Sequence, residues 1–254
     1  MKKIKLFVLL IVTAFVTLTS CKKENKKKNL YLSLQSKEVL RYRIATGLKT
    51  KDGDRVTAKT YLKIENQGIE NDSLFNLNFD VEKLTYKSKF SKDISGNEKK
   101  ESDHLLINDF INYLEKNKEK KTNKTIRYTK KGKVLDRNSN AFLPLEILNL
   151  KHFQIVFPEK RIDLKESWIV TDKLEYGEVV SKYTLEEITN DAFYIDMVRE
   201  VKLNAKDKLF SEKEFKVEGV YVLDRLDRTI LQGAVRYELD SLCDITLNIA
   251  EIKK

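Results

Sequence analysis

The sequence predicts an α+β fold that is mainly β: a long, curved antiparallel sheet of about ten strands, forming a half-barrel that two helices cover. Apolar and polar residues alternate with a period of two through most of the chain, as in strands with one buried face. Two segments show helical spacing instead. Hydrophobic residues make up 41% of the 254 residues and include 12 Phe and 11 Tyr. This apolar content is sufficient for a core and excludes a disordered or low-complexity chain.

The strands are predicted where the alternation is clearest. Phe75, Leu77 and Phe79, for example, alternate with asparagines, so one face of that strand is expected to be buried. Asp52-Gly53 and Asn66-Gln67-Gly68 supply turn residues between the first strands. A twisted antiparallel sheet of this size tends to curl, which gives it a concave face. The predicted strands are 40–48, 56–64, 75–82, 125–135, 167–174, 179–188, 193–203, 215–223, 230–239 and 243–252.

Two helices are predicted to cover the concave face of the sheet. Residues 104–120 place apolar side chains on one face at helical spacing, with Ser102 or Asp103 as the cap. The second helix, residues 144–152, is shorter and has Pro144 in its first turn, where the fixed backbone angle of proline suits a helix. The apolar faces of both helices are expected to pack on the sheet.

Residues 1–20 have the three zones of an export signal. A basic start precedes the apolar run from Leu6 to Val16, and these 11 residues are too few to span a bilayer, which needs roughly 20. Shortly after this run come Leu18-Thr19-Ser20-Cys21, which resemble the lipobox of bacterial lipoproteins. The resemblance implies that Cys21 is acylated and becomes the first residue of a membrane-anchored protein. An ordinary signal peptide with an incidental cysteine is the alternative.

The mature chain is predicted to have two parts. Residues 22–29 contain five Lys and no apolar residue, so residues 21–30 are predicted to be a lipidated cysteine and a flexible basic tether. Residues 31–254 are predicted to form a single half-barrel domain, because no linker rich in Pro, Gly or Ser divides them.

The residues around Cys21 also bear on localisation. The Ser-Cys-Lys-Lys start and the Lys- and Asn-rich composition are similar to those of Bacteroidota lipoproteins. In the sorting rule of enteric bacteria, Lys22 rather than Asp after the cysteine implies the outer membrane. Only Glu24 is acidic in this segment, whereas surface-exposed lipoproteins of that group carry an acidic signal. The periplasmic face of the outer membrane is therefore expected rather than the cell surface.

Two further segments resemble uncharacterised exported lipoproteins with an incomplete β-barrel. Residues 157–168 are similar to their proline-containing segment that ends in Ser-Trp and opens the C-terminal sheet, and residues 219–229 are similar to their later hairpin. The chain has Lys165-Glu166 and Asp227-Arg228 where that pattern has a turn glycine. The order of strands and helices is also similar to that of the LolA and LolB lipoprotein carriers, which have half-barrel folds.

The net charge of +10 does not indicate a nucleic-acid-binding protein. Three of the positive charges belong to the predicted signal peptide and a net four to the tether, which leaves +3 on the predicted domain. Binding to nucleic acid requires clustered positive charge. Lysines in the tether are better placed to face anionic lipid head groups.

Two residues are candidates for ligand binding. Arg199 interrupts a row in which Ile195 and Met197 share its face. It is predicted either to line a cavity, where it would suit an anionic head group, or to extend its long stem to solvent at an edge. Trp168 alternates with Val170 and is predicted to pack in the core, with stacking on a ligand as the alternative.

No other residue pattern predicts catalysis, a metal site or a cofactor. His104 and His152 lack neighbouring ligands at metal-binding spacing, so solvated or capping roles are expected for them. Cys243 lies in an apolar row and is expected to be a small buried side chain rather than a nucleophile. The sequence has no Gly-rich phosphate loop, G-x-S-x-G or H-E-x-x-H motif. We therefore expect the protein not to be an enzyme.

Three functions fit these features. The favoured one is a membrane-anchored lipoprotein of the cell envelope that binds, without catalysis, a hydrophobic or lipid-like ligand on its apolar concave face. The second is a structural or assembly lipoprotein whose interior is filled by its own side chains. The third is a glycan-binding protein that uses surface aromatic residues. A roomy apolar cavity would favour the first function, a filled interior the second, and a solvent-facing aromatic row the third.

Overall fold

The computed structural model describes residues 27–35, 38–91, 102, 104–117, 123–135, 155–174, 177–204, 213–239 and 243–252. The predicted signal peptide, Cys21 and the predicted helix 144–152 lie outside these residues, as do His152 and the side chain of Cys243. In the part of the chain that is described, ten strands form one antiparallel sheet, accompanied by one helix, α2 (Leu105–Asn117). The predicted mainly β class and the long antiparallel sheet are confirmed.

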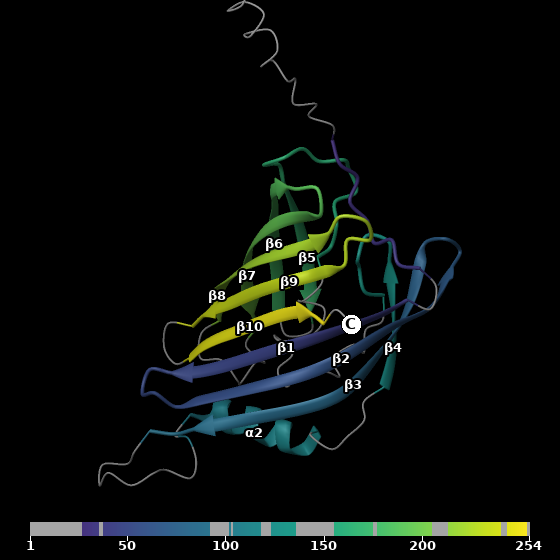
Figure 1. The fold of residues 1–254 in the computed structure, drawn as a ribbon. Coiled ribbons are helices and arrows are strands. Elements are labelled where there is room, and N and C mark those ends of the chain that lie inside the picture. Colours follow the sequence, from purple (N-terminus) through teal and green to yellow (C-terminus); the bar gives the residue numbers. More distant parts are fainter. Residues whose placement is uncertain are drawn as a thin grey trace, which may run out of the picture.

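The ten strands follow one another across the sheet in a simple order. The order is β4-β3-β2-β1-β10-β9-β8-β7-β6-β5, so β4 and β5 are the two edges and the first and last strands pair at the centre. Figure 1 shows that the sheet is strongly curved and open. The strands are β1 (Val39–Thr50), β2 (Arg55–Glu70), β3 (Leu74–Lys89), β4 (Asn123–Thr129), β5 (Ser167–Leu174), β6 (Gly177–Ile188), β7 (Ala192–Leu203), β8 (Glu214–Asp224), β9 (Ile230–Glu238) and β10 (Cys243–Glu251).

The alternation in the sequence becomes two faces of the sheet. In β7, Ile195 and Met197 are buried whereas Asp196 and Val198 are exposed, and the other long strands repeat this pattern. The buried rows of all ten strands join one hydrophobic cluster on the concave side. A shift of one residue in any pairing would turn an apolar row to solvent, so this pattern fixes the register.

The turn predicted at Asn66-Gln67-Gly68 is wrong, because β2 continues through it with a bulge. The Nδ2 of Asn66 donates to the carbonyl of Gln35 at 2.8 Å, and its Oδ1 accepts from the N–H of Gly68 at 3.2 Å. These bonds bend the strand without reversing it. The reversal comes at Asn71 and Asp72, whose φ angles of 48° and 53° suit the tight hairpin between β2 and β3.

Strand β4 ends at Thr129, six residues before the predicted end at residue 135. The chain reverses here: the N–H of Thr129 donates to the carbonyl of Lys133 at 2.9 Å. Gly132 has a φ of 80°, and a Cβ on it would lie 2.4 Å from the carbonyl oxygen of Ile155. A larger residue at this turn would therefore collide with the neighbouring segment.

Both positions that lack the expected turn glycine adopt a left-handed backbone. The φ angle is 68° at Lys165 and 63° at Arg228. This conformation costs a residue with a Cβ roughly 1 kcal/mol relative to glycine. The backbone of the two turns thus keeps the conformation that glycine would favour, although the side chains differ.

The predicted tether extends too far, because its last residues belong to the fold. Lys28 forms a β-bridge with Ile162, and Leu30 is completely buried. The Nζ of Lys131 donates to the carbonyls of Leu30 at 3.1 Å and Pro158 at 2.7 Å. The N-terminal segment, residues 27–35, and the connecting segment, residues 155–166, are therefore held together beside the end of β4.

Helix α2 is attached to the sheet by its apolar face. Leu106, Ile107, Phe110 and Leu114 are buried and join the hydrophobic cluster of the sheet. The helix contacts β2 and β3, and Figure 1 shows it next to β3. The prediction of this helix is confirmed.

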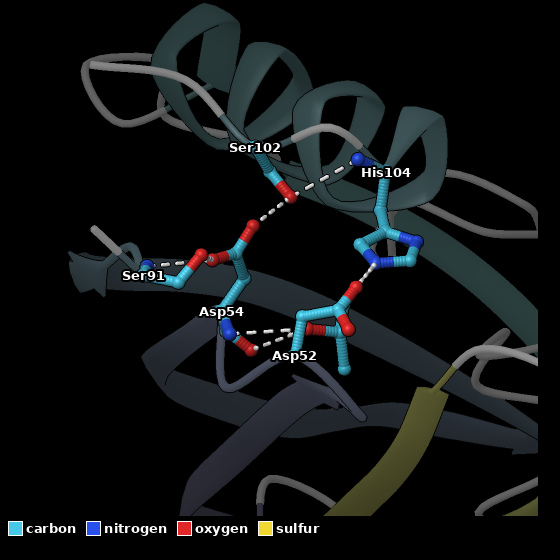
Figure 2. Close-up of polar contacts among 6 residues, drawn as sticks. Asp52, Asp54, Ser91, Ser102 and His104 are labelled. Atoms are coloured by element: carbon cyan, nitrogen blue, oxygen red, sulfur yellow. Dashed lines mark hydrogen bonds and ion pairs between the residues drawn. The ribbon is translucent and has the colours of Figure 1, made fainter. Parts of the chain in front are cut away.

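The start of α2 is held by a buried carboxylate (Figure 2). Asp54, in the turn between β1 and β2, is 1% exposed. Its Oδ1 accepts from the N–H of Ser91 at 2.7 Å and from the hydroxyl of Ser91 at 2.8 Å, and its Oδ2 accepts from the hydroxyl of Ser102. Ser102 in turn accepts from the N–H of His104 at 3.1 Å. One carboxylate thus connects the first hairpin, the end of β3 and the beginning of α2.

Candidate ligand-binding site

An apolar cavity opens on the concave side of the sheet, over β1 to β4. The volume of the cavity that water can occupy is about 80 Å³. One water needs about 10–15 Å³ of such space. The cavity therefore has room for several waters or for a stretch of a slender alkyl chain.

The walls of the cavity come from distant parts of the chain. The sheet supplies one wall, and the N-terminal segment, the connecting segment and the turn between β8 and β9 supply the others. Most of the lining side chains are aliphatic or aromatic, which makes water a poor occupant. The lining residues are Leu32, Leu34, Leu40, Tyr42, Ile44, Leu62, Ile64, Leu77, Phe79, Tyr128, Gly132, Ile155, Phe157, Leu223, Arg228, Thr229, Ile230 and Ile249.

Polar groups of the lining gather near the turn between β8 and β9. Arg228 and Thr229 come from this turn, and Tyr42 of β1 hydrogen-bonds to Thr229. Burial raises the pKa of the Tyr42 hydroxyl far above its ordinary value, and the negative charges of Glu251 and Asp227 raise it further. Tyr42 is therefore a neutral hydroxyl at the edge of an apolar space.

Arg199 is buried, but it does not line this cavity. Its side chain is 3% exposed, so the expected extension to solvent is wrong. Its Nε donates to the hydroxyl of Ser181 at 2.8 Å, and its Nη2 donates to the hydroxyl of Tyr183 at 3.4 Å. The apolar cavity lies over other strands, so Arg199 does not take part in it, and a ligand contact at Arg199 stays a prediction.

A cluster of tyrosines surrounds the Arg199 guanidinium. Burial alone lowers the pKa of Arg199, but the phenol groups of Tyr183, Tyr221 and Tyr237 together raise it above its ordinary value, so the group stays charged. Burial raises the pKa of Tyr237 to about 12 and that of Tyr221 still further, although the charge of Arg199 lowers both. The described surroundings of Arg199 are therefore buried and polar.

Trp168 packs in the core, as predicted. Its ring stacks on Tyr183 with 5.3 Å between centroids, and its Nε1 donates to the carbonyl of Val156 at 2.7 Å. It also borders an open groove along β5 whose other walls include Lys133 and Glu159. At 8% exposure, the ring does not form a surface on which a glycan could stack.

The residues around Asp54 include two serines, a histidine and a second aspartate, but not in a catalytic arrangement. The hydroxyl proton of Ser102 is donated to Asp54, so it is not available to a histidine base. The Nε2 of His104 lies 3.0 Å from the Oδ2 of Asp52, a carboxylate that is 72% exposed. The ring of His104 therefore pairs with Asp52, whereas Ser102 is the side chain that accepts from the N–H at the start of α2.

Sequence reasoning did not find Arg228 or the cavity itself. The rows of alternating apolar residues show which side chains face inward. All such rows look alike in the sequence, so they do not show where the interior leaves a cavity. Leu32 and Leu34 lie outside any predicted strand, and Arg228 lies in a turn where a charged residue is ordinary. The missing glycine at Arg228 was the one local sign that this turn is unusual.

The fold and this site define an open, curved antiparallel sheet protein with an apolar cavity on its concave face. No protein-family model matches the chain, and a search of curated proteins finds no match. Among solved structures, the chain is similar to lipovitellin, in a structure described as lipid-protein interactions in lipovitellin, with 12% identity and a TM-score of 0.49. The match covers 87% of this chain and 26% of the lipovitellin chain.

A second solved structure, the S-type phycobiliprotein lyase from Guillardia theta, is similar at 4% identity with a TM-score of 0.26. This match covers 84% of our chain and 86% of the lyase. Neither likeness identifies a family, so the resemblance to lipoproteins with an incomplete β-barrel stays a prediction. In the described residues, no helix is both long and apolar enough to cross a membrane.

Proposed function

We propose that the protein is a lipid-anchored binding protein of the bacterial cell envelope and that its concave cavity holds one slender apolar chain. The observation that carries this proposal is the apolar cavity between the sheet, the N-terminal segment and the connecting segment. Apolar cavities of this kind, with a few polar groups at one edge, are usual ligand sites. The anchor, the outer-membrane location and the absence of catalysis are part of the proposal and rest on the sequence patterns around Cys21 and on the missing catalytic motifs.

The size of the cavity limits the ligand. A whole two-chain lipid does not fit in about 80 Å³, whereas part of one alkyl chain does. Burying each CH₂ group contributes about 0.8 kcal/mol, so even a partly enclosed chain of several carbons binds measurably. The second candidate is a structural or assembly lipoprotein, which is favoured by the contacts of Arg199 with side chains of the protein itself.

Filling the cavity is expected to abolish ligand binding. Ile64 of β2 lines the cavity and is only half-buried, so Ile64→Trp places a large ring in the apolar space at little cost to folding. Protein comprising residues 22–254, which includes every described residue, is purified from bacteria and analysed by native mass spectrometry for retained lipid. We expect the parent protein to retain single-chain lipid and Ile64→Trp to retain none.

The matched control for this experiment is Ile188→Trp. Ile188 is also half-buried and packs against the hydrophobic cluster, but it does not line the cavity. It should leave lipid retention unchanged. A parent protein that neither retains lipid nor takes up added fatty acid would contradict ligand binding and favour the structural role.

Removing the anchoring residue is expected to release the protein from membranes. Cys21→Ala removes the thiol that the acyl chains would modify. Loss of the thiol should prevent acylation. Because two or three acyl chains hold a protein stably on a bilayer, the protein without them should move from the membrane fraction towards the soluble fraction. The measurement is metabolic labelling with palmitate together with membrane fractionation. Palmitate labelling that persists in Cys21→Ala would refute the lipoprotein proposal.

A further inference from the structure

Two arginines in the turn between β8 and β9 lie against the same aromatic ring. The Cζ atom of Arg225 is 4.5 Å from the centroid of the Phe193 ring, and the Cζ atom of Arg228 is 5.9 Å from it. Arg228 is also 5.1 Å from the ring centroid of Tyr31, in the N-terminal segment. Two positive charges are thus held close together by aromatic faces, and one of them, Arg228, lines the apolar cavity.

Each of these guanidinium groups has a buried donor that lacks an acceptor. Across the described part of the chain, the Nη1 of Arg225 and the Nε of Arg228 are shielded from solvent and have no hydrogen-bond partner. Arg228 uses its Nη1 to donate to the carbonyl of Leu226 in the same turn. A buried N–H without an acceptor destabilises the protein, and more so when the group is charged. A bound ligand that supplies an acceptor would remove this cost.

The acidic side chains of the turn do not supply these acceptors. The Oδ1 of Asp224 accepts from the backbone N–H groups of Leu226 at 2.6 Å and Asp227 at 3.3 Å. The Oδ1 of Asp227 accepts from the N–H and the hydroxyl of Thr229, both at 2.7 Å. Both carboxylates therefore shape the turn itself, and the arginine donors remain for another partner.

We propose that the cavity binds a single-chain fatty acid, with the alkyl chain in the apolar space and the carboxylate on Arg228. This proposal rests on the function proposed above and names its ligand class. A guanidinium donates readily to a carboxylate, and the contact is strongest where water is excluded. The hydroxyls of Thr229 and Tyr42 lie on the same polar edge of the cavity, but they hydrogen-bond to Asp227 and to each other, so Arg228 is the group that would bind the carboxylate.

The test compares two probes that differ only in the head group. Dodecanoate and dodecanol are titrated by calorimetry into protein comprising residues 22–254. We expect dodecanoate to bind about tenfold more tightly or better, since a charge-assisted hydrogen bond contributes about 1.5–3 kcal/mol. In Arg228→Gln this preference should disappear while dodecanol binding stays the same.

Three further variants make the result specific. Arg228→Lys keeps the charge and should keep part of the preference, which separates a lost head-group contact from a misfolded turn. Arg225→Gln should reduce the preference less, because Arg225 does not line the cavity. Arg43→Gln is the matched control, since Arg43 is exposed on the opposite face of β1 from Tyr42 and should change nothing.

The outcomes separate the two proposals. Equal binding of dodecanoate and dodecanol, or a preference that survives in Arg228→Gln, would overturn the fatty-acid assignment and leave the apolar ligand site standing. If neither probe binds and Ile64→Trp behaves like the parent protein, the ligand site itself is overturned.

Discussion

Raising the pH above 10 is expected to unfold the protein cooperatively, because tyrosines that include Tyr42, Tyr221 and Tyr237 are buried as neutral phenols. Burial raises the pKa of Tyr237 from 10.0 to about 12 and raises the pKa values of Tyr42 and Tyr221 further still. In the unfolded chain these groups lose their protons near pH 10. The stabilising contribution is therefore complete below pH 10 and is lost as the pH rises towards the folded pKa values.

The expected loss is large. Each tyrosine that ionises only in the unfolded state lowers the free energy of unfolding by about 1.4 kcal/mol per pH unit, so three of them lower it by about 4 kcal/mol per unit. A domain of ordinary stability, about 5–15 kcal/mol, then unfolds within a few pH units above 10. Circular dichroism and the ultraviolet absorbance of tyrosinate should change together.

Two variants test the assignment of this pH dependence. Tyr237→Phe removes one of these groups and should reduce the slope of stability against pH by about 1.4 kcal/mol per pH unit. Tyr61→Phe is the control, because Tyr61 lies on the outer face of β2 and is half-exposed, so it should leave the slope unchanged. Tyrosinate absorbance that appears well before the loss of secondary structure would show that these phenols are accessible in the folded protein.

Replacing Asp54 is expected to destabilise the protein by about 3–5 kcal/mol. Asp54→Ala leaves both donors of Ser91 and the hydroxyl of Ser102 without their acceptor in a buried site. It also removes the connection that holds the start of α2 on the first hairpin. Chemical denaturation measures the stability, and hydrogen exchange should show that the protection of α2 falls more than that of β8 and β9.

The neighbouring acid provides the matched control. Asp52 lies two residues away in the same turn and pairs with His104, but its carboxylate is 72% exposed. Exposed pairs contribute about 0–1 kcal/mol, so Asp52→Ala should cost little. Asp54→Asn keeps one acceptor oxygen and should lie between the two. Equal effects of Asp52→Ala and Asp54→Ala would show that Asp54 does not organise this region.

The strands could be predicted because their pattern is local. A period of two places Ile195 and Met197 on one face and Asp196 on the other, whatever the strand pairs with. The same row identified Arg199 as an exception, although its surroundings could not be predicted. The hydroxyls that contact it come from Ser181 and Tyr183 on the adjacent strand, and only strand pairing brings them together.

The predicted boundaries were wrong where a local sequence pattern is compatible with two different structures. Asn66 and Gly68 are typical of a turn, but the hydrogen bond from Asn66 to Gln35, 31 residues away, makes them a bulge. The tether was predicted to reach residue 30 because its polar residues cannot form a core. Burial of Leu30 and the contacts of Lys131 show that the last residues of the predicted tether belong to the fold.

The sequence by itself determined that this protein has a large antiparallel sheet with one apolar face, and it also yielded the prediction of a lipid anchor at Cys21. Both follow from patterns within short stretches of chain. Only the tertiary structure decided that β1 pairs with β10, that Arg199 is buried among polar groups, and that an apolar cavity lies beside Arg228. The reason is that a cavity depends on how side chains from distant segments, here from Leu32 to Ile249, fill the space between them.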